Sequence, residues 1–231
     1  MKVLECLSLT KNYGRLCAVD RLNFSVGKGR IVGLLGTNGS GKTTLMKMVA
    51  GLLTPTTGQI LICGKSPCAE TKAMVSYLPD TDYLPGYMKV RQLIRMFKDF
   101  YKDFDADRAE QMMSRLGIGA ELRLRTLSKG TREKVGLVLT MSRRAKLYLL
   151  DEPIGGVDPA ARDYIIETII NNYDRESSVI ISTHLISDVE NVLDDFLFID
   201  KGRIIECGCV ETVREEKGKT VDELFREVFR C

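Results

Sequence analysis

The chain has 231 residues, of which 44% are hydrophobic and 28% are charged, and its formal net charge is +3. This length can bury one sizeable core, or one core with a small subdomain, and the composition is ordinary for a soluble globular protein. The weak charge gives no reason to expect a nucleic-acid partner. No apolar run approaches the ~18–20 residues that span a bilayer, and no signal peptide is visible, so we expect a cytosolic protein.

The seven cysteines do not predict a metal or disulfide site. They are Cys6, Cys17, Cys63, Cys68, Cys207, Cys209 and Cys231. They form no C-x₂-C pair, and the single histidine lies elsewhere in the chain. An odd number of cysteines without a secretory signal favours reduced thiols that act as small hydrophobic residues.

The first 30 residues predict antiparallel strands. Apolar residues alternate in 3–7 and again in 18–26, and a glycine-rich turn follows at 27–29. Between the two segments, Tyr13 stands beside Gly14. This tyrosine either packs at the end of a strand or stacks on a purine base. The phosphate-binding pattern that follows in the chain favours stacking.

Residues 36–44 fit the pattern G-x-x-x-x-G-K-[ST], in which backbone N–H groups surround phosphate oxygens. The loop consists of Gly36, Thr37, Asn38, Gly39, Ser40, Gly41, Lys42, Thr43 and Thr44. Lys42 is expected to reach the β- and γ-phosphates, and the Thr43 hydroxyl to bind Mg²⁺. An apolar strand at 31–35 precedes the loop and a helix at 45–53 follows it, so the helix N-terminus points at the anion. The pattern predicts a nucleotide-binding site.

Two more apolar segments, 58–64 and 73–80, predict strands, and Pro79 interrupts the second. From Val90 the apolar spacing becomes helical. Three helices are expected, the third beginning after Ser128. With strands before and after, residues 86–146 predict an inserted helical subdomain.

The segment 147–153 predicts a buried strand that ends in Asp151 and Glu152, and a carboxylate at that position suits a second element of an Mg²⁺ site. Asp158 and Pro159 have the residue types that begin a helix, whose inward side is expected to carry Ile165, Ile166, Ile169 and Ile170.

Residues 178–182 predict an apolar parallel strand ending at Thr183 and His184. A hairpin at 196–207 and an amphipathic helix from Val221 complete the chain. The expected fold is α/β with a mostly parallel sheet, an antiparallel β subdomain at the N-terminus and the inserted helices.

In their order and spacing, these segments resemble the nucleotide-binding subunit of an ATP-binding cassette (ABC) transporter. Residues 126–131 read T-L-S-K-G-T where the family has its L-S-G-G-Q signature, 154–158 lie at its D-loop, and 182–184 contain its switch histidine. The resemblance covers nearly the whole chain. It implies a P-loop NTPase with a RecA-like core in 1–85 and 147–231, and a helical subdomain in 86–146, within one ABC ATPase domain of residues 1–231.

The resemblance also implies roles for individual residues. Glu152 is expected to be the base or to orient the attacking water, and His184 to contact the γ-phosphate and that water, with ATP and Mg²⁺ as cofactors. Tyr13 is expected to stack on adenine, and Lys42 to bind the phosphates. Thr43, Asp80 and Asp151 are expected to bind the metal. Ser128, Lys129 and Gly130 are expected to face the nucleotide of a second subunit, and Asp158 belongs to the D-loop.

Three motifs depart from the family pattern. The signature has Lys129 and Thr131 in place of its second glycine and its glutamine, and the D-loop has Gly155 where serine is usual. Asp80 follows Pro79 where the family has the Q-loop glutamine. A carboxylate there can still bind Mg²⁺ through water, but it adds negative charge near the γ-phosphate.

The resemblance implies a subunit that dimerises around two ATP molecules and drives a separate integral membrane permease from the cytoplasmic face of the cell membrane. It implies no nucleic-acid partner. Two alternatives remain open: a soluble ABC-type ATPase that acts on ribosomes or nucleic acid, and a nucleotide-gated regulatory subunit with weak hydrolysis.

Overall fold

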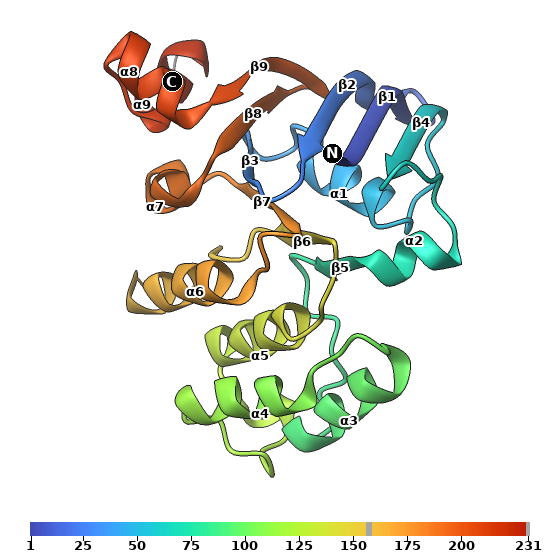
Figure 1. The fold of residues 1–231 in the computed structure, drawn as a ribbon, viewed down its shortest axis with the longest axis vertical. Coiled ribbons are helices and arrows are strands. Elements are labelled where there is room, and N and C mark those ends of the chain that lie inside the picture. Colours follow the sequence, from blue (N-terminus) through green and yellow to red (C-terminus); the bar gives the residue numbers. More distant parts are fainter. Residues whose placement is uncertain (156–158, 230–231) are drawn as a thin grey trace.

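The computed structural model describes residues 1–155 and 159–229. A three-stranded antiparallel sheet begins the chain, with the strand order β2-β1-β4. Its strands are β1 (Lys2–Tyr13), β2 (Leu16–Gly27) and β4 (Thr57–Ile62). Figure 1 shows this sheet beside α1 (Lys42–Val49), at the opposite end of the molecule from the inserted helices. The antiparallel N-terminal part predicted from the sequence is confirmed.

The second sheet has six strands in the order β5-β6-β7-β3-β8-β9. They are β5 (Val75–Leu78), β6 (Leu147–Asp151), β7 (Ser178–Thr183), β3 (Ile31–Leu35), β8 (Asp195–Asp200) and β9 (Arg203–Cys209). The first five run parallel, and β9 returns antiparallel to β8. The three central strands are buried along their whole length, which explains their continuous apolar sequence.

Side chains of the six-stranded sheet alternate between two apolar clusters. Val32 and Leu34 pack with α1 and the antiparallel sheet, whereas Ile31 and Leu35 pack on the other side, with the helices that follow β5 and β6. The period of two residues along a strand produces this division. A residue's position in its strand therefore decides whether its side chain lies on the α1 face.

Three inserted helices, α3 (Val90–Phe100), α4 (Ala106–Arg115) and α5 (Lys129–Met141), lie between β5 and β6 in sequence and form the lower end of the molecule in Figure 1. Leu93, Ile94 and Phe97 of α3 are buried against the other two helices. Ser128 is the N-cap of α5, because its side chain accepts a hydrogen bond from the Thr131 N–H at 3.2 Å.

Five further helices lie in the described residues: α2 (Ala69–Met74), α6 (Pro159–Asn172), α7 (Ile186–Val189), α8 (Val210–Lys217) and α9 (Val221–Phe229). Two short 3₁₀ helices lie at Leu124–Thr126 and Glu190–Val192. In the last helix, Phe225 packs edge-on against Phe198 of β8. The C-terminal helices thus cover the end of the sheet next to β8 (Figure 1).

Three sequence predictions of local structure were wrong in detail. The helix after the phosphate loop begins at Lys42 and ends at Val49, because Gly51 takes a positive φ of 71° that ends it before Thr54. Residues 73 and 74 belong to α2, so the strand predicted from 73 begins at Val75. Ile165 and Ile169 are buried as predicted, but Ile170 is 41% exposed.

One buried arginine connects the inserted helices to the sheet. Arg143 follows α5, is 3% exposed, and pairs through two nitrogens with Asp103, in the connection between α3 and α4, at 3.1 and 3.2 Å. Its other donors reach the backbone oxygens of Ala73 and of Val75, the latter at 2.6 Å. The guanidinium also lies 4.1 Å from the ring centre of Tyr101. These contacts connect the end of α5 and the segment between α3 and α4 to the start of β5.

We predict that Arg143→Met lowers the free energy of unfolding by about 3 kcal/mol, because the substitution leaves a carboxylate and two carbonyls without their partner. Urea denaturation measures the change. The neighbouring Arg144→Met is the matched control. Arg144 pairs with Asp105 but its side chain is 75% exposed, so its loss is expected to cost less than about 1 kcal/mol. Equal losses in the two variants would contradict the structural role assigned to Arg143.

Candidate ATP-binding site

The loop of residues 36–44 leaves no room for side chains at two of its glycines. A Cβ on Gly36 would lie 2.3 Å from the carbonyl oxygen of Ile199, and a Cβ on Gly41 would lie 2.4 Å from that of Ala18. Gly41 also has a φ of 109°, which other residues rarely adopt. The turn between β8 and β9 supports the loop, since the Gly202 N–H donates to Ser40 O at 2.8 Å. The loop is therefore held between the two sheets.

The polar groups of the loop are arranged to receive an anion. Lys42 is 5% exposed, and its Nζ donates to the carbonyls of Gly36 at 2.8 Å and Thr37 at 3.2 Å. The Ser40 hydroxyl is buried and has no hydrogen-bond partner among the residues that the structure describes. The backbone N–H groups that begin α1 have no partner within the helix. A phosphate group would satisfy these donors.

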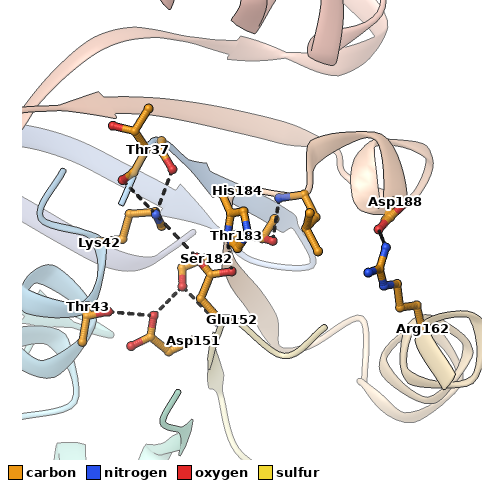
Figure 2. A network of polar contacts seen from close by, with 12 residues as sticks. Thr37, Lys42, Thr43, Asp151, Glu152, Arg162, Ser182, Thr183, His184 and Asp188 are labelled. Atoms are coloured by element: carbon orange, nitrogen blue, oxygen red, sulfur yellow. Dashed lines mark hydrogen bonds and ion pairs between the residues drawn. The ribbon is translucent and has the colours of Figure 1, made fainter. Parts of the chain in front are cut away.

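Asp151 ends β6 and is 1% exposed. Its Oδ1 accepts hydrogen bonds from the hydroxyls of Ser182 and of Thr43, the latter at 3.2 Å, and its Oδ2 accepts from the Tyr77 hydroxyl at 3.3 Å. Burial raises the pKa of Asp151 above its usual value, and the hydroxyls of Ser182 and Thr43 oppose that rise. The carboxylate is thus desolvated but surrounded by hydroxyl donors (Figure 2).

Glu152 lies between Lys42 and His184, as Figure 2 shows. Its Oε1 is 3.5 Å from Lys42 Nζ, and its Oε2 is 3.0 Å from His184 Nδ1. The backbone of Glu152 has a φ of 51°, which is uncommon for a residue other than glycine. Its N–H donates to Ser182 O at 3.0 Å, which attaches this strained turn to β7. The side chain is thereby directed to the phosphate loop.

The parallel strands explain why these residues meet. Asp151 is paired with Ser182 across β6 and β7, and Leu34 is paired with Ser182 across β3 and β7. The phosphate loop follows β3 directly, and His184 follows β7. Residues from three separate segments therefore lie at one edge of the sheet, where open α/β sheets bind their ligands.

Other predicted site residues lie around this centre. Tyr13 is half-exposed at the end of β1, with Lys11 Nζ 5.4 Å from its ring centre. Thr37, Asn38 and Gly39 are exposed at the tip of the phosphate loop, and Thr44 lies in the first turn of α1. Asp80 follows β5 and lines a cavity of about 140 Å³ together with Asp151 and Glu152.

The signature residues lie apart from the phosphate loop. Ser128, Lys129 and Gly130 stand at the N-terminus of α5, and among the described residues no hydrogen bond or ion pair connects them to residues 36–44. Lys129 lines the same cavity as Asp80. Asp158, predicted for the D-loop, lies outside the described residues.

Sequence reasoning missed two side chains of the site, Ser182 and Tyr77. The sequence places Ser182 only in the histidine motif, although its hydroxyl contacts the carboxylate of Asp151. Tyr77 lies in the segment 73–80, for which the sequence predicts only a strand. Burial, and then the charge of Asp151, raise the pKa of Tyr77 above its usual value. Both residues share the α1 face with Asp151, because side chains alternate between the two faces along each strand.

The donor set fits Mg²⁺. Thr43 offers a hydroxyl and Asp151 a carboxylate, and hard oxygen ligands of this kind usually hold Mg²⁺ together with phosphate oxygens and water. Within the described ranges, no cluster of three or more histidine, cysteine or acidic side chains is arranged to hold a metal by itself. The cysteines described in the structure, Cys6 to Cys209, are free thiols, whereas Cys231 lies outside the described residues.

The fold and the site together define a P-loop nucleoside triphosphatase. The family described as ABC transporter matches residues 19–155, which is more than half of the chain. The chain therefore belongs to the ABC transporter family, in which it is an ATP-binding subunit. Membership of this family implies ATP hydrolysis.

Relatives and solved structures agree with this assignment. The chain is 30% identical to the uncharacterized ABC transporter ATP-binding protein YhcH of Bacillus subtilis, an alignment that covers 98% of this chain and 75% of the relative. It is also 30% identical to the Nod factor export ATP-binding protein I of Cupriavidus metallidurans, covering 96% and 77%. A solved ATP-binding subunit of an ABC transporter superimposes with a TM-score of 0.88 at 27% identity, over 98% of this chain and 99% of that one. The predicted fold class is confirmed.

We predict that Asp151→Asn raises the free energy of unfolding by about 1 kcal/mol at pH 7, since it removes a desolvated charge. The pKa of Asp151 is raised in the folded chain, so the charged carboxylate lowers the free energy of unfolding at pH values above that pKa. This loss of stability disappears as the pH falls through the pKa and the carboxylate is protonated. The gain should therefore shrink towards acid pH. Urea denaturation at several pH values measures it, and a gain that does not depend on pH would contradict this account.

Proposed function

We propose that this chain is an Mg²⁺-dependent ATPase that dimerises around two ATP molecules and drives a separate membrane permease. The observation that supports the proposal most directly is the contact network joining Lys42, Thr43, Asp151, Glu152 and His184. These residues come from three segments that are distant in sequence. Each carries a group that phosphoryl transfer to water requires.

In the proposed reaction, Glu152 orients the attacking water and accepts its proton, while His184 holds the side chain of Glu152 and contacts the γ-phosphate. Lys42 must exchange its contacts with Gly36 O, Thr37 O and Glu152 for phosphate oxygens. That exchange frees Glu152 only when nucleotide is bound. Thr43 and Asp151 would hold Mg²⁺, which neutralises charge on the phosphates. Tyr13 would stack on adenine.

The proposed dimer completes each site with residues of the other subunit. Ser128, Lys129 and Gly130 lie at a helix N-terminus, which favours an anion, and Ser128 and Lys129 are exposed in a single chain. We propose that they contact the γ-phosphate held by the partner, and that Asp158 belongs to the same interface. Residues 86–146 would form the helical subdomain, and 1–85 with 147–231 the core.

A permease is proposed as the membrane partner because the relatives carry transporter names. In the part of the chain that the structure describes, no helix has the length and apolar character needed to cross a bilayer. The ATPase would then work at the cytoplasmic face of the cell membrane, attached through the permease. No nucleic-acid partner is proposed.

We predict that Glu152→Gln still binds ATP but hydrolyses it at least ~10²-fold more slowly, because glutamine cannot accept the proton of the water. The stalled protein should accumulate as an ATP-bound dimer. A phosphate-release assay measures turnover, and size-exclusion chromatography with ATP measures the dimer.

Asp174→Asn is a suitable control for this change, since Asp174 lies in the exposed connection between α6 and β7. It should hydrolyse ATP at the unmodified rate. If Glu152→Gln turned over as fast as this control, Glu152 would not have the proposed role.

We also predict that the tagged chain, isolated from native membranes in mild detergent, brings with it a protein with several membrane-spanning helices. Mass spectrometry identifies the partner. Recovery with ribosomal proteins instead, and no membrane protein, would favour the soluble ABC-type ATPase and contradict the transporter role.

A further inference from the structure

The acceptor positions of Asp151 are unevenly occupied. A carboxylate offers about two lone-pair positions on each oxygen. Ser182 and Thr43 both donate to Oδ1, which uses the two positions there. Among the described residues, the Tyr77 hydroxyl is the one hydrogen-bond partner of Oδ2, at 3.3 Å. One acceptor position on Oδ2 therefore remains open.

The strands determine why a tyrosine makes this contact. Tyr77 is paired with Leu149 across β5 and β6. Asp151 lies two residues beyond Leu149 in β6, which is roughly 6.6 Å further along that strand. Both side chains lie on the α1 face, because Leu149 and Tyr77 pack in the same apolar cluster and Asp151 keeps the alternation. A short side chain at position 77 would not bridge this offset. The tyrosine ring does so with only two rotatable bonds.

The ring of Tyr77 is itself held in place. It packs partly buried in the cluster that contains Leu45, Met46 and Val49 of α1, the helix that carries Lys42 and Thr43 at its start. Tyr77 thus packs its ring against the apolar cluster to which α1 contributes, and contacts the carboxylate of Asp151 with its hydroxyl. Asp80, at the position of the Q-loop glutamine, follows Tyr77 by three residues and lies just beyond the end of β5.

We infer that Tyr77 is a positioning residue for the metal site: its hydroxyl holds Asp151 in the orientation that presents the open position on Oδ2 to Mg²⁺ or to a water bound to it. This inference rests on the proposed Mg²⁺-dependent ATPase function. Without the hydroxyl, the carboxylate keeps its two donors on Oδ1 but rotates more freely about them. Supporting hydrogen bonds of this kind commonly change metal affinity 10- to 100-fold.

The test is Tyr77→Phe, which removes the hydroxyl and keeps the ring. A fluorescent ATP analogue is titrated with Mg²⁺, and binding is also measured in EDTA. We expect the same affinity in EDTA and an increase of about tenfold in the Mg²⁺ concentration that gives half-maximal binding. At saturating Mg²⁺, kcat should return to within about threefold of the unmodified chain.

Tyr148→Phe is the matched control. Tyr148 is buried, and its hydroxyl donates to the backbone carbonyl of Arg143, away from the nucleotide site. Urea denaturation of both variants shows that they are folded and how much stability each has lost. The control should respond to Mg²⁺ as the unmodified chain does.

Two results would overturn the inference: an unchanged Mg²⁺ midpoint in Tyr77→Phe, or an equal shift in Tyr148→Phe, which would show a general effect of lost stability. In both cases the unmodified chain still binds the nucleotide with Mg²⁺, so the proposed function stands. If the unmodified chain bound no nucleotide at any Mg²⁺ concentration, the proposed function would fail and the inference with it.

Discussion

Strands β6, β7 and β3 lie side by side and run in the same direction, so that the residues following them emerge at one edge of the sheet. Lys42, Glu152 and His184 are far apart in the sequence and meet because of this arrangement. In an antiparallel sheet, neighbouring strands would direct these residues to opposite edges. The apolar character of the three strands is therefore a requirement of the site as well as of the core, since parallel strands are stable only when both faces are covered.

The site contains buried charge that the fold alone would not favour. Asp151 is desolvated, and Glu152 has a strained backbone. The carboxylate of Glu152 also lies near Lys42, which would bind the phosphates of a nucleotide. Such features cost stability and persist where the surrounding structure enforces them. Here the hydroxyls of Ser182 and Thr43 hold the carboxylate of Asp151. The backbone pairing between β6 and β7 holds the turn at Glu152. A phosphate group can replace the contacts that Lys42 makes with Gly36 O, Thr37 O and Glu152.

Much of this fold could be predicted because its signals are local. The phosphate loop, the strand before it and the apolar strand ending in Asp151 are all visible in short windows of sequence. The six-residue α2 was missed because so short a helix has no clear period, and Ile170 was misplaced because burial of a helix face depends on what covers it. Tyr77 was missed for a related reason. Its contact with Asp151 depends on the register between β5 and β6, which no single segment contains.

Two of the departures from the family pattern line the same cavity in the structure. Asp80 and Lys129 come from β5 and α5, and both line the cavity that reaches Asp151 and Glu152. Asp80 and Lys129 have opposite effects on the pKa of Glu133, which lines the same cavity. Burial raises this pKa, Lys129 lowers it, and Asp80 raises it. The extra negative charge beside the phosphate site is therefore accompanied by an extra positive charge on the same cavity. Since the effect of a charge near a phosphate depends on the sum of charges around it, the consequence of Asp80 must be judged together with Lys129.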